Sequence, residues 1–233
     1  MPTRRRTPLT RDRALRCAVE LADAEGLDAV TMRNLAGRLG VVPMALYKHV
    51  ANKEDLLDGM VDVLVAAIVP PDPHQPWKDA VRGTVLDARR MIERHPWARS
   101  AIETRTRRTP TVLRYMDALA GTFLAAGFSA DLTHHVMHAL GHRIWGFSPE
   151  AFDAPDEPDA ATPPADPAQA EDMVAQMSRS YPSITAITLA TIDGDLTRLG
   201  EGCDEDFEFT FALDLLLDAV ERLRDARWSS QPR

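Results

Sequence analysis

The segment from Thr31 to Lys53, TMRNLAGRLGVVPMALYKHVANK, constrains the fold of this chain more than any other stretch. Thr31 can cap a short helix that runs to about Leu39, and Gly40 can supply the positive φ that a tight turn needs. Pro43 suits the first turn of a second short helix. Two short helices joined by such a turn form a helix-turn-helix, whose second helix enters the major groove of DNA. The segment therefore predicts a DNA-binding unit.

Apolar residues recur at helical spacing through the rest of the chain, and no sustained alternation of apolar and polar residues predicts a strand. We therefore expect an all-α fold. Thr10 can cap a helix that ends at Gly26, and Asn52 can cap another that runs from Lys53 to about Ile68. Further helices are expected at about 77–94, 97–104, 110–126, 131–147, 168–180, 183–196 and 204–227.

These helices predict a small N-terminal domain and a larger C-terminal one. We expect a flexible basic arm at 1–9, a three-helix helix-turn-helix domain at 10–53, and a connecting helix and loop at 54–76. Four prolines between residues 69 and 76 predict that loop. A larger helical domain follows at 77–228, interrupted by a mobile loop at 149–167 that holds six prolines.

The charge of the chain is divided unevenly between these parts. The net charge is −8, but residues 1–53 contain ten Lys and Arg residues and only five acids. The first 53 residues therefore carry +5, which leaves −13 for the remainder. A basic N-terminal part, residues 1–53 and called the head below, suits DNA because neutralisation of the DNA phosphates supplies most of the non-specific affinity.

The exposed side of the second motif helix carries side chains suited to phosphates. Lys48 and Lys53 can pair with phosphate groups, and Tyr47 and His49 can donate hydrogen bonds to phosphate oxygens. Arg33, in the preceding helix, is the best candidate for a bidentate contact to guanine. The alternative is that Arg33 and Lys48 are solvated charges and that Tyr47 belongs to the core.

The start of the same helix is apolar. Pro43, Met44 and Ala45 cannot make bidentate polar contacts to bases, so they would read thymine methyl groups or DNA shape. The predicted DNA-contacting residues are Thr31, Arg33, Val42, Pro43, Met44, Ala45, Tyr47, Lys48, His49 and Lys53.

Residues 10–68 closely resemble the DNA-binding domain of TetR-family bacterial repressors. The resemblance rests on the runs AVELADAEGL, TMRNLA, LGV and LYKHVANK. The tetracycline-repressor-like branch is the most similar, because its recognition helix also ends in Leu-Tyr-x-His-Val-x-Asn-Lys. The resemblance implies operator contacts at Arg33, Pro43, Met44, Ala45, Tyr47, Lys48, His49 and Lys53. The sequence departs from that branch at 42–45, so it does not imply the same operator sequence.

The resemblance also implies what the larger domain does. Family members bind a small-molecule inducer there and form homodimers through a four-helix bundle, to which the helices near 131–147 and 204–227 correspond. We therefore expect a repressor of a roughly palindromic double-stranded operator. The histidine that anchors the drug in the tetracycline repressor is replaced here by Val69. Tetracycline with magnesium is accordingly not the expected inducer.

Two groups of side chains are candidates for the inducer pocket. The larger side chains that could wall an apolar cavity are Trp97, Met116, Phe123, Met137 and Trp145. Aromatic and methionine side chains at helical spacing also fit an ordinary core, which is the alternative.

Histidines form the second group. His134, His138 and His142 share one helical stripe, so neighbouring pairs could chelate a metal. We expect His134 and His138 to serve the pocket or an interface, because no thiolate or carboxylate that completes a metal site is identifiable. A metal-responsive repressor that uses all three remains the alternative.

Other classes of protein have little support in the sequence. It contains no GxSxG, P-loop, dinucleotide or HExxH motif, so we expect no enzyme and no cofactor, and a helical enzyme is a remote alternative. No apolar run reaches the length of a membrane span. The two cysteines are far apart and form no metal or redox motif, which is typical of a reduced, cytoplasmic location.

Overall fold

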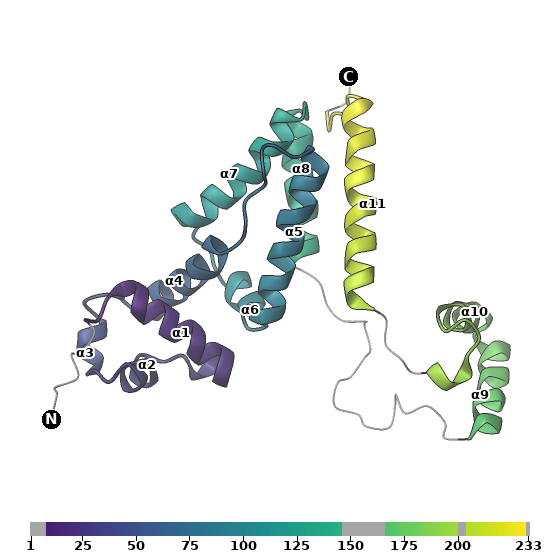
Figure 1. The fold of residues 1–233 in the computed structure, drawn as a ribbon, viewed down its shortest axis with the longest axis horizontal. Coiled ribbons are helices and arrows are strands. Elements are labelled where there is room, and N and C mark those ends of the chain that lie inside the picture. The colour runs from purple at the N-terminus through teal and green to yellow at the C-terminus, as the bar shows by residue number, and fades with distance from the viewer. Residues whose placement is uncertain (1–7, 146–165, 200–203, 232–233) are drawn as a thin grey trace. The chain divides into compact units, whose positions relative to one another are not determined.

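The computed structural model describes residues 8–145, 166–199 and 204–231, and every regular element in these ranges is a helix (Figure 1). The all-α prediction is therefore confirmed for this part of the chain. Contacts divide the chain into two compact units, residues 1–147 with 210–233 and residues 148–209. The expected basic arm and the expected mobile loop lie almost entirely outside the described residues.

The first unit begins with α1 (Arg11–Glu25), a short 3-10 turn (Leu27–Ala29), α2 (Met32–Leu39), α3 (Pro43–Leu46) and α4 (Lys53–Ala66). Thr10, Thr31 and Asn52 cap α1, α2 and α4, as the sequence predicts. Each side-chain oxygen accepts a hydrogen bond from the backbone N–H three residues on. Gly40 ends α2 in the left-handed conformation at φ 67°, so α3 can turn back across it.

Close packing fixes α1 against α4. A Cβ placed on Gly59 would lie 2.5 Å from Cδ2 of Leu15, so any larger residue at this position would require the Leu15 side chain to shift. Leu35, Leu46 and Met60 are fully buried and bring α2, α3 and α4 into the same small core. The angle between α2 and α3 is therefore set by packing rather than by the turn alone.

The remainder of the first unit is a larger helical body. It contains α5 (Trp77–Arg94), α6 (Ala98–Glu103), α7 (Pro110–Ala125), α8 (Ala130–Trp145) and most of α11 (Glu205–Asp225). An aromatic cluster lies at one end, where the Phe123 ring is 5.7 Å from that of Trp77 and 5.2 Å from that of Phe128. The core also includes Val81, Val85, Met91, Leu119, Leu132, Val136, Leu140, Leu213 and Leu217.

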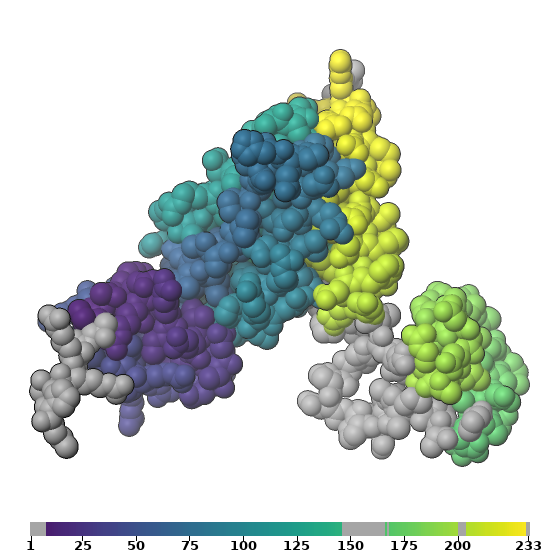
Figure 2. Space-filling view, viewed as in Figure 1, coloured from purple at the N-terminus to yellow at the C-terminus, as the bar shows by residue number. Residues whose placement is uncertain are grey.

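Ion pairs attach α11 to α5. The Lys78 ammonium lies 2.8 Å from Asp218 and 2.6 Å from Glu221, and the Arg82 guanidinium lies 2.7 Å from Asp214. These pairs and the buried leucines orient α11, whose yellow surface joins the blue and teal helices along one side (Figure 2).

The second unit contains α9 (Pro167–Ser180), α10 (Pro182–Thr191) and a 3-10 turn (Leu196–Arg198) around a small apolar core. Two expectations are wrong here. The helix expected at 183–196 ends at Thr191, because Asp193 and Gly194 adopt positive φ values of 51° and 76°. Pro167, expected in the loop, begins α9, whose first turn is capped by the Asp166 carboxylate.

Candidate functional site

The short helix α3 presents apolar side chains to solvent. Val42 and Met44 are 68% and 71% exposed, whereas Leu46 is fully buried and anchors the helix. Pro43 occupies the first position, and Ala45 is half-buried between the exposed side chains. Large apolar side chains gathered at an exposed point are typical of a contact surface. The helix ends sooner than the sequence suggests, and Tyr47 begins a turn.

The predicted polar contacts lie around this helix. Tyr47 and Lys48 are exposed in the turn after α3, and His49 is half-buried beside them. Thr31 is also exposed, although its hydroxyl caps α2. Three of these four residues are therefore exposed to solvent, as a contact with DNA would require.

Three cations of the head are available for phosphates. Arg33, Lys48 and Lys53 are exposed, and no carboxylate of the described residues lies within ion-pair distance of them. By contrast, the Arg38 guanidinium lies 3.3 Å from Glu25. The structure thus separates cations that are free to meet a polyanion from those already paired within the head.

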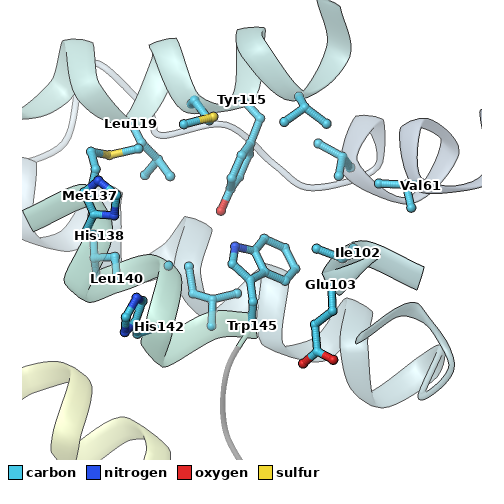
Figure 3. Close-up of a pocket in the computed structure, with 15 residues that line it drawn as sticks. Val61, Ile102, Glu103, Tyr115, Leu119, Met137, His138, Leu140, His142 and Trp145 are labelled. Atoms are coloured by element: carbon cyan, nitrogen blue, oxygen red, sulfur yellow. The ribbon is translucent and has the colours of Figure 1, made fainter. Parts of the chain in front are cut away.

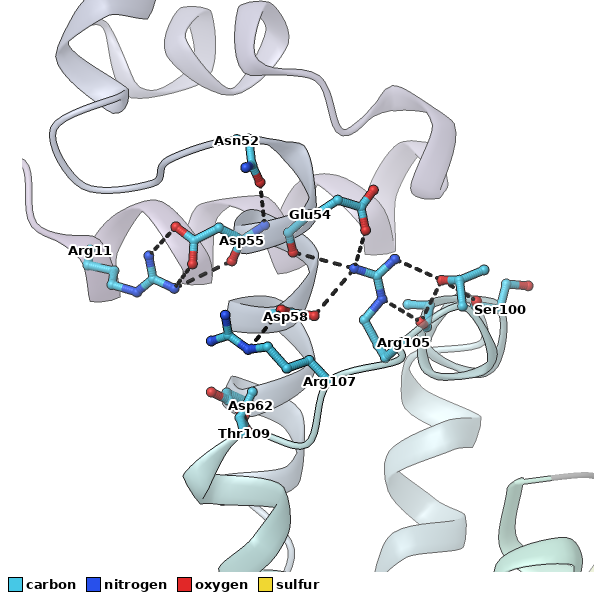
Figure 4. Close-up of polar contacts among 12 residues, drawn as sticks. Arg11, Asn52, Glu54, Asp55, Asp58, Asp62, Ser100, Arg105, Arg107 and Thr109 are labelled. Atoms are coloured by element: carbon cyan, nitrogen blue, oxygen red, sulfur yellow. Dashed lines mark hydrogen bonds and ion pairs between the residues drawn. The ribbon is translucent and has the colours of Figure 1, made fainter.

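Arg11 has a different role, which the sequence did not indicate (Figure 4). Its guanidinium makes a bidentate pair with the Asp55 carboxylate at 2.7 and 2.9 Å and donates to the His49 carbonyl at 2.8 Å. Asp55 also accepts a hydrogen bond from the Ala51 N–H. These hydrogen bonds, chiefly that from Arg11, lower the pKa of Asp55 below its usual value. Arg11 therefore fastens the turn after α3 to both α1 and α4.

A cavity of about 560 Å³ lies in the larger body, between α4, α6, α7 and α8 (Figure 3). Its size is typical of a site for a small organic molecule. Its wall is mostly aliphatic and aromatic. The lining residues are Val61, Val65, Ile102, Glu103, Val112, Tyr115, Met116, Leu119, Met137, His138, Leu140, Gly141, His142, Ile144 and Trp145.

The structure brings four of the seven predicted pocket residues to this cavity: Met116, Met137, His138 and Trp145. His134 lines a neighbouring hollow of about 490 Å³ between α7 and α8. Trp97 and Phe123 lie elsewhere. The Trp97 indole donates to the Asp23 carboxylate at 2.6 Å, and Phe123 is part of the aromatic cluster beside Trp77.

Sequence reasoning missed the lining residues of α4 and α6, and Tyr115 of α7. A signal for them was present, because Val61 and Val65 are four residues apart, as are Tyr115 and Leu119. Such spacing places each pair on one helix face, but it does not show which face meets a cavity. Tyr115 differs from the other lining side chains in its buried hydroxyl, which has no hydrogen-bond partner among the described residues.

The histidine stripe lies on the outer side of α8. The His134 and His138 rings are 4.7 Å apart between centroids, and His142 also lines the cavity. All three side chains are exposed. Within the ranges that the structure describes, no three His, Cys, Asp or Glu side chains are grouped closely enough to hold a metal ion.

A polar network joins the wall of the cavity to α4 (Figure 4). Arg105 follows α6, and its guanidinium lies 2.7 Å from the Glu54 carboxylate and 3.4 Å from that of Asp58. The Arg105 and Asp58 side chains are only 11% and 15% exposed. The Thr109 hydroxyl donates to Asp62, one turn further along α4. These contacts connect the end of α6 and the loop after it to α4.

No helix of the described ranges is both long and apolar enough to cross a membrane. The sequence matches two family models. Residues 14–60 match the model for bacterial regulatory proteins of the tetR family, and residues 69–224 match the tetracyclin repressor-like C-terminal domain. The second match alone spans more than half of the chain.

Individual relatives agree with these matches. An HTH-type transcriptional regulator of Saccharopolyspora erythraea is 33% identical over 153 residues, which cover 61% of this chain and 65% of that protein. This chain thus spans just under two thirds of that relative. The tetracycline repressor protein class G of Vibrio anguillarum is 27% identical over 230 residues, 94% of this chain and 97% of that one.

Solved structures share the fold. Apo ActR from Streptomyces coelicolor is 23% identical, with a TM-score of 0.70 over 95% of this chain and 99% of that chain. ActR in complex with (S)-DNPA is 25% identical, with a TM-score of 0.64 over 92% of this chain and 98% of that chain.

Proposed function

Because this chain belongs to the TetR family of bacterial regulators, we propose that it is a homodimeric transcriptional repressor released from a palindromic operator by a small-molecule inducer. The observation that carries the proposal is that one helix, α4, packs against α1 of the N-terminal domain and also lines the cavity. Acting on DNA, the protein would work in the cytoplasm as a binding protein without catalysis.

The head would read DNA through α3. Arg33, Lys48 and Lys53 would neutralise phosphates or, in the case of Arg33, bind guanine. The exposed side chains of Val42 and Met44 would meet thymine methyl groups, since they offer no hydrogen bonds. Specificity would then depend more on methyl contacts and DNA shape than on a dense set of polar contacts.

The dimer would form through α8 and α11. Phe211 and Leu215 are 52% and 53% exposed and four residues apart on α11, so they lie on one face of that helix. Leu213 and Leu217, on its other face, are fully buried in the chain's own core. Two such helices from each chain would build the four-helix bundle that the family resemblance implies. A two-fold dimer presents its heads to a roughly palindromic site.

Induction would act through the cavity wall. A molecule bound in the cavity contacts Ile102 of α6 and Val61 of α4, and Arg105 ties the same two helices together. A shift between α6 and α4 would alter the separation of the two heads. The inducer can favour release only by the difference in its affinity for the two arrangements.

The cavity and the solved ActR complexes support an organic inducer. ActR binds (S)-DNPA and actinorhodin in its solved complexes, which supports an organic inducer for this chain. The side chain at position 69 does not line the cavity, and Val69 is exposed, so the histidine that anchors a tetracycline–magnesium complex in the tetracycline repressor has no counterpart at this position. The metal-responsive repressor that would use His134, His138 and His142 is the alternative to this proposal.

The test is selection of bound fragments from the genome of the source organism with the purified full chain. We expect enrichment of a short palindrome that is bound more weakly as salt rises. Selection is repeated with protein that has been unfolded and refolded, to remove any copurified ligand. Failure to enrich any fragment in both experiments would contradict the proposed function.

A further inference from the structure

The Tyr115 hydroxyl is the unusual polar group of the cavity. It is buried, and it has no hydrogen-bond partner among the residues that the structure describes. Burial also raises the pKa of this phenol, so the group stays protonated and can donate. Buried hydroxyl groups in folded proteins nearly always find a partner, and one without a partner inside the chain is suited to a ligand.

The hydroxyl lies among the residues that line the cavity, on the side of the Tyr115 ring that faces Trp145 (Figure 3). Tyr115 extends from α7 toward Trp145 of α8, whose ring lies 6.4 Å away between centroids at an interplanar angle of 68°. Met116 and Met137 line the same space, and methionine adapts readily to aromatic surfaces. The walls around the hydroxyl therefore favour a flat aromatic body.

The charges of the lining restrict the ligand further. Within the described ranges no Lys or Arg lines the cavity, and Glu103 contributes a carboxylate at its exposed edge. An anion would lose its hydration without gaining a cationic partner, and Glu103 would repel it. The other polar lining groups, His138 and His142, lie on the exposed side of α8 in the single chain.

We propose that the cavity selects an uncharged, flat aromatic molecule whose carbonyl oxygen accepts a hydrogen bond from Tyr115, which makes Tyr115 the specificity-determining residue. This inference deepens the proposed function and rests on it, because the cavity is taken as the inducer site. A carbonyl is the matching group because the unpaired phenol is a donor and a carbonyl oxygen is an acceptor.

The experiment compares 9-fluorenone with fluorene, which has the same ring system without the carbonyl. Binding to the full chain is measured by equilibrium dialysis in the absence of DNA. The variants are Tyr115→Phe and, as a matched control, Tyr181→Phe, which makes the same change at an exposed tyrosine of the second unit. Each probe is compared with itself across the proteins, so differences in hydrophobicity between the probes cancel.

We expect Tyr115→Phe to weaken fluorenone binding by about fivefold, which corresponds to one net hydrogen bond, and to leave fluorene binding unchanged. Tyr181→Phe should change neither. A charged analogue, 9-fluorenone-4-carboxylate, should bind the unaltered chain at least about tenfold more weakly than fluorenone. Equal losses for both probes, no loss for either, no binding of either, or full binding of the carboxylate would overturn the inference.

A second measurement needs no probe. If the Tyr115 hydroxyl is unpaired, Tyr115→Phe should leave the thermal midpoint unchanged or raise it, because the variant no longer buries an unsatisfied group. A clear fall in the midpoint would mean that the hydroxyl has a partner within the chain, and the inference would fail. Operator affinity is measured separately, so selective loss of fluorenone binding without any effect of fluorenone on the operator would refute only the inducer role.

Discussion

The polar network of Arg105 allows a quantitative test of how the cavity wall is joined to the head. Arg105 holds Glu54 and Asp58 of α4, and its side chain is 11% exposed. Arg105→Gln removes the charge and leaves Asp58, among the described residues, with Arg107 as its remaining ion-pair partner, whose guanidinium lies 4.0 Å away. Breaking a fully buried pair costs about 3–5 kcal/mol, because the remaining charge is stranded.

The expected loss is smaller than that limit. Glu54 is 71% exposed and regains its hydration, so only Asp58 is left in a poor environment. We therefore expect Arg105→Gln to lower the free energy of unfolding by about 2 kcal/mol. The matched control is Arg16→Gln, because the Arg16–Asp12 pair is about two-thirds exposed on both sides and should contribute less than about 0.5 kcal/mol.

Urea unfolding at one fixed protein concentration measures both variants, since dimer stability depends on concentration. Hydrogen exchange should also show faster opening at the N-terminal turn of α4 in Arg105→Gln, where Glu54 loses its partner. Equal stability losses in the two variants, or unchanged exchange in α4, would refute the view that Arg105 holds the head-bearing helix.

The remaining predictions concern the head and the dimer. Lys53→Gln should weaken binding to all DNA sequences and reduce the slope of log affinity against log salt by about one, whereas Arg179→Gln in the second unit should not; equal slopes for both would remove Lys53 from the contacts. Asp55→Asn should destabilise the chain by about 1 kcal/mol at pH 7, where the lowered pKa of Asp55 keeps its carboxylate charged. Because the unfolded carboxyl binds protons first, this difference should shrink in pH-dependent unfolding as the pH falls below about 4, and a constant difference would contradict it. Leu215→Asp should yield monomers in sedimentation velocity at micromolar concentration, while Leu124→Asp, at a similarly exposed position on α7, should leave the dimer intact. Dimers of both variants would exclude α11 from the interface.

Local chemistry made the helices of the head predictable from the sequence. Thr10, Thr31 and Asn52 act as caps where their residue types indicate, and Gly40 adopts the predicted positive φ. Caps and turns depend on residues three or four positions apart, so the sequence displays them directly. The end of α10 was predicted wrongly because its apolar pattern continues past Thr191. The Asp193–Gly194 pair, which signals a turn, was given less weight than that pattern.

The cavity was predictable only in part. Met116, Met137 and Trp145 were expected there and do line it, but so were Trp97 and Phe123, which do not. The type of a side chain indicates whether it is buried. Which residues a buried aromatic ring packs against depends on parts of the chain that are distant in sequence. Trp97 is held by Asp23, 74 positions away, and no spacing pattern reveals such a pair.

The most direct test of the central claim is the affinity of the full chain for the palindrome recovered by selection. Fluorescence anisotropy would compare it with a scrambled duplex of the same composition, at several salt concentrations. We predict two chains per duplex, a preference of at least about a thousandfold for the palindrome, and weaker binding to both duplexes as salt rises. Equal affinity for the two duplexes, or one chain bound per palindrome, would contradict the account.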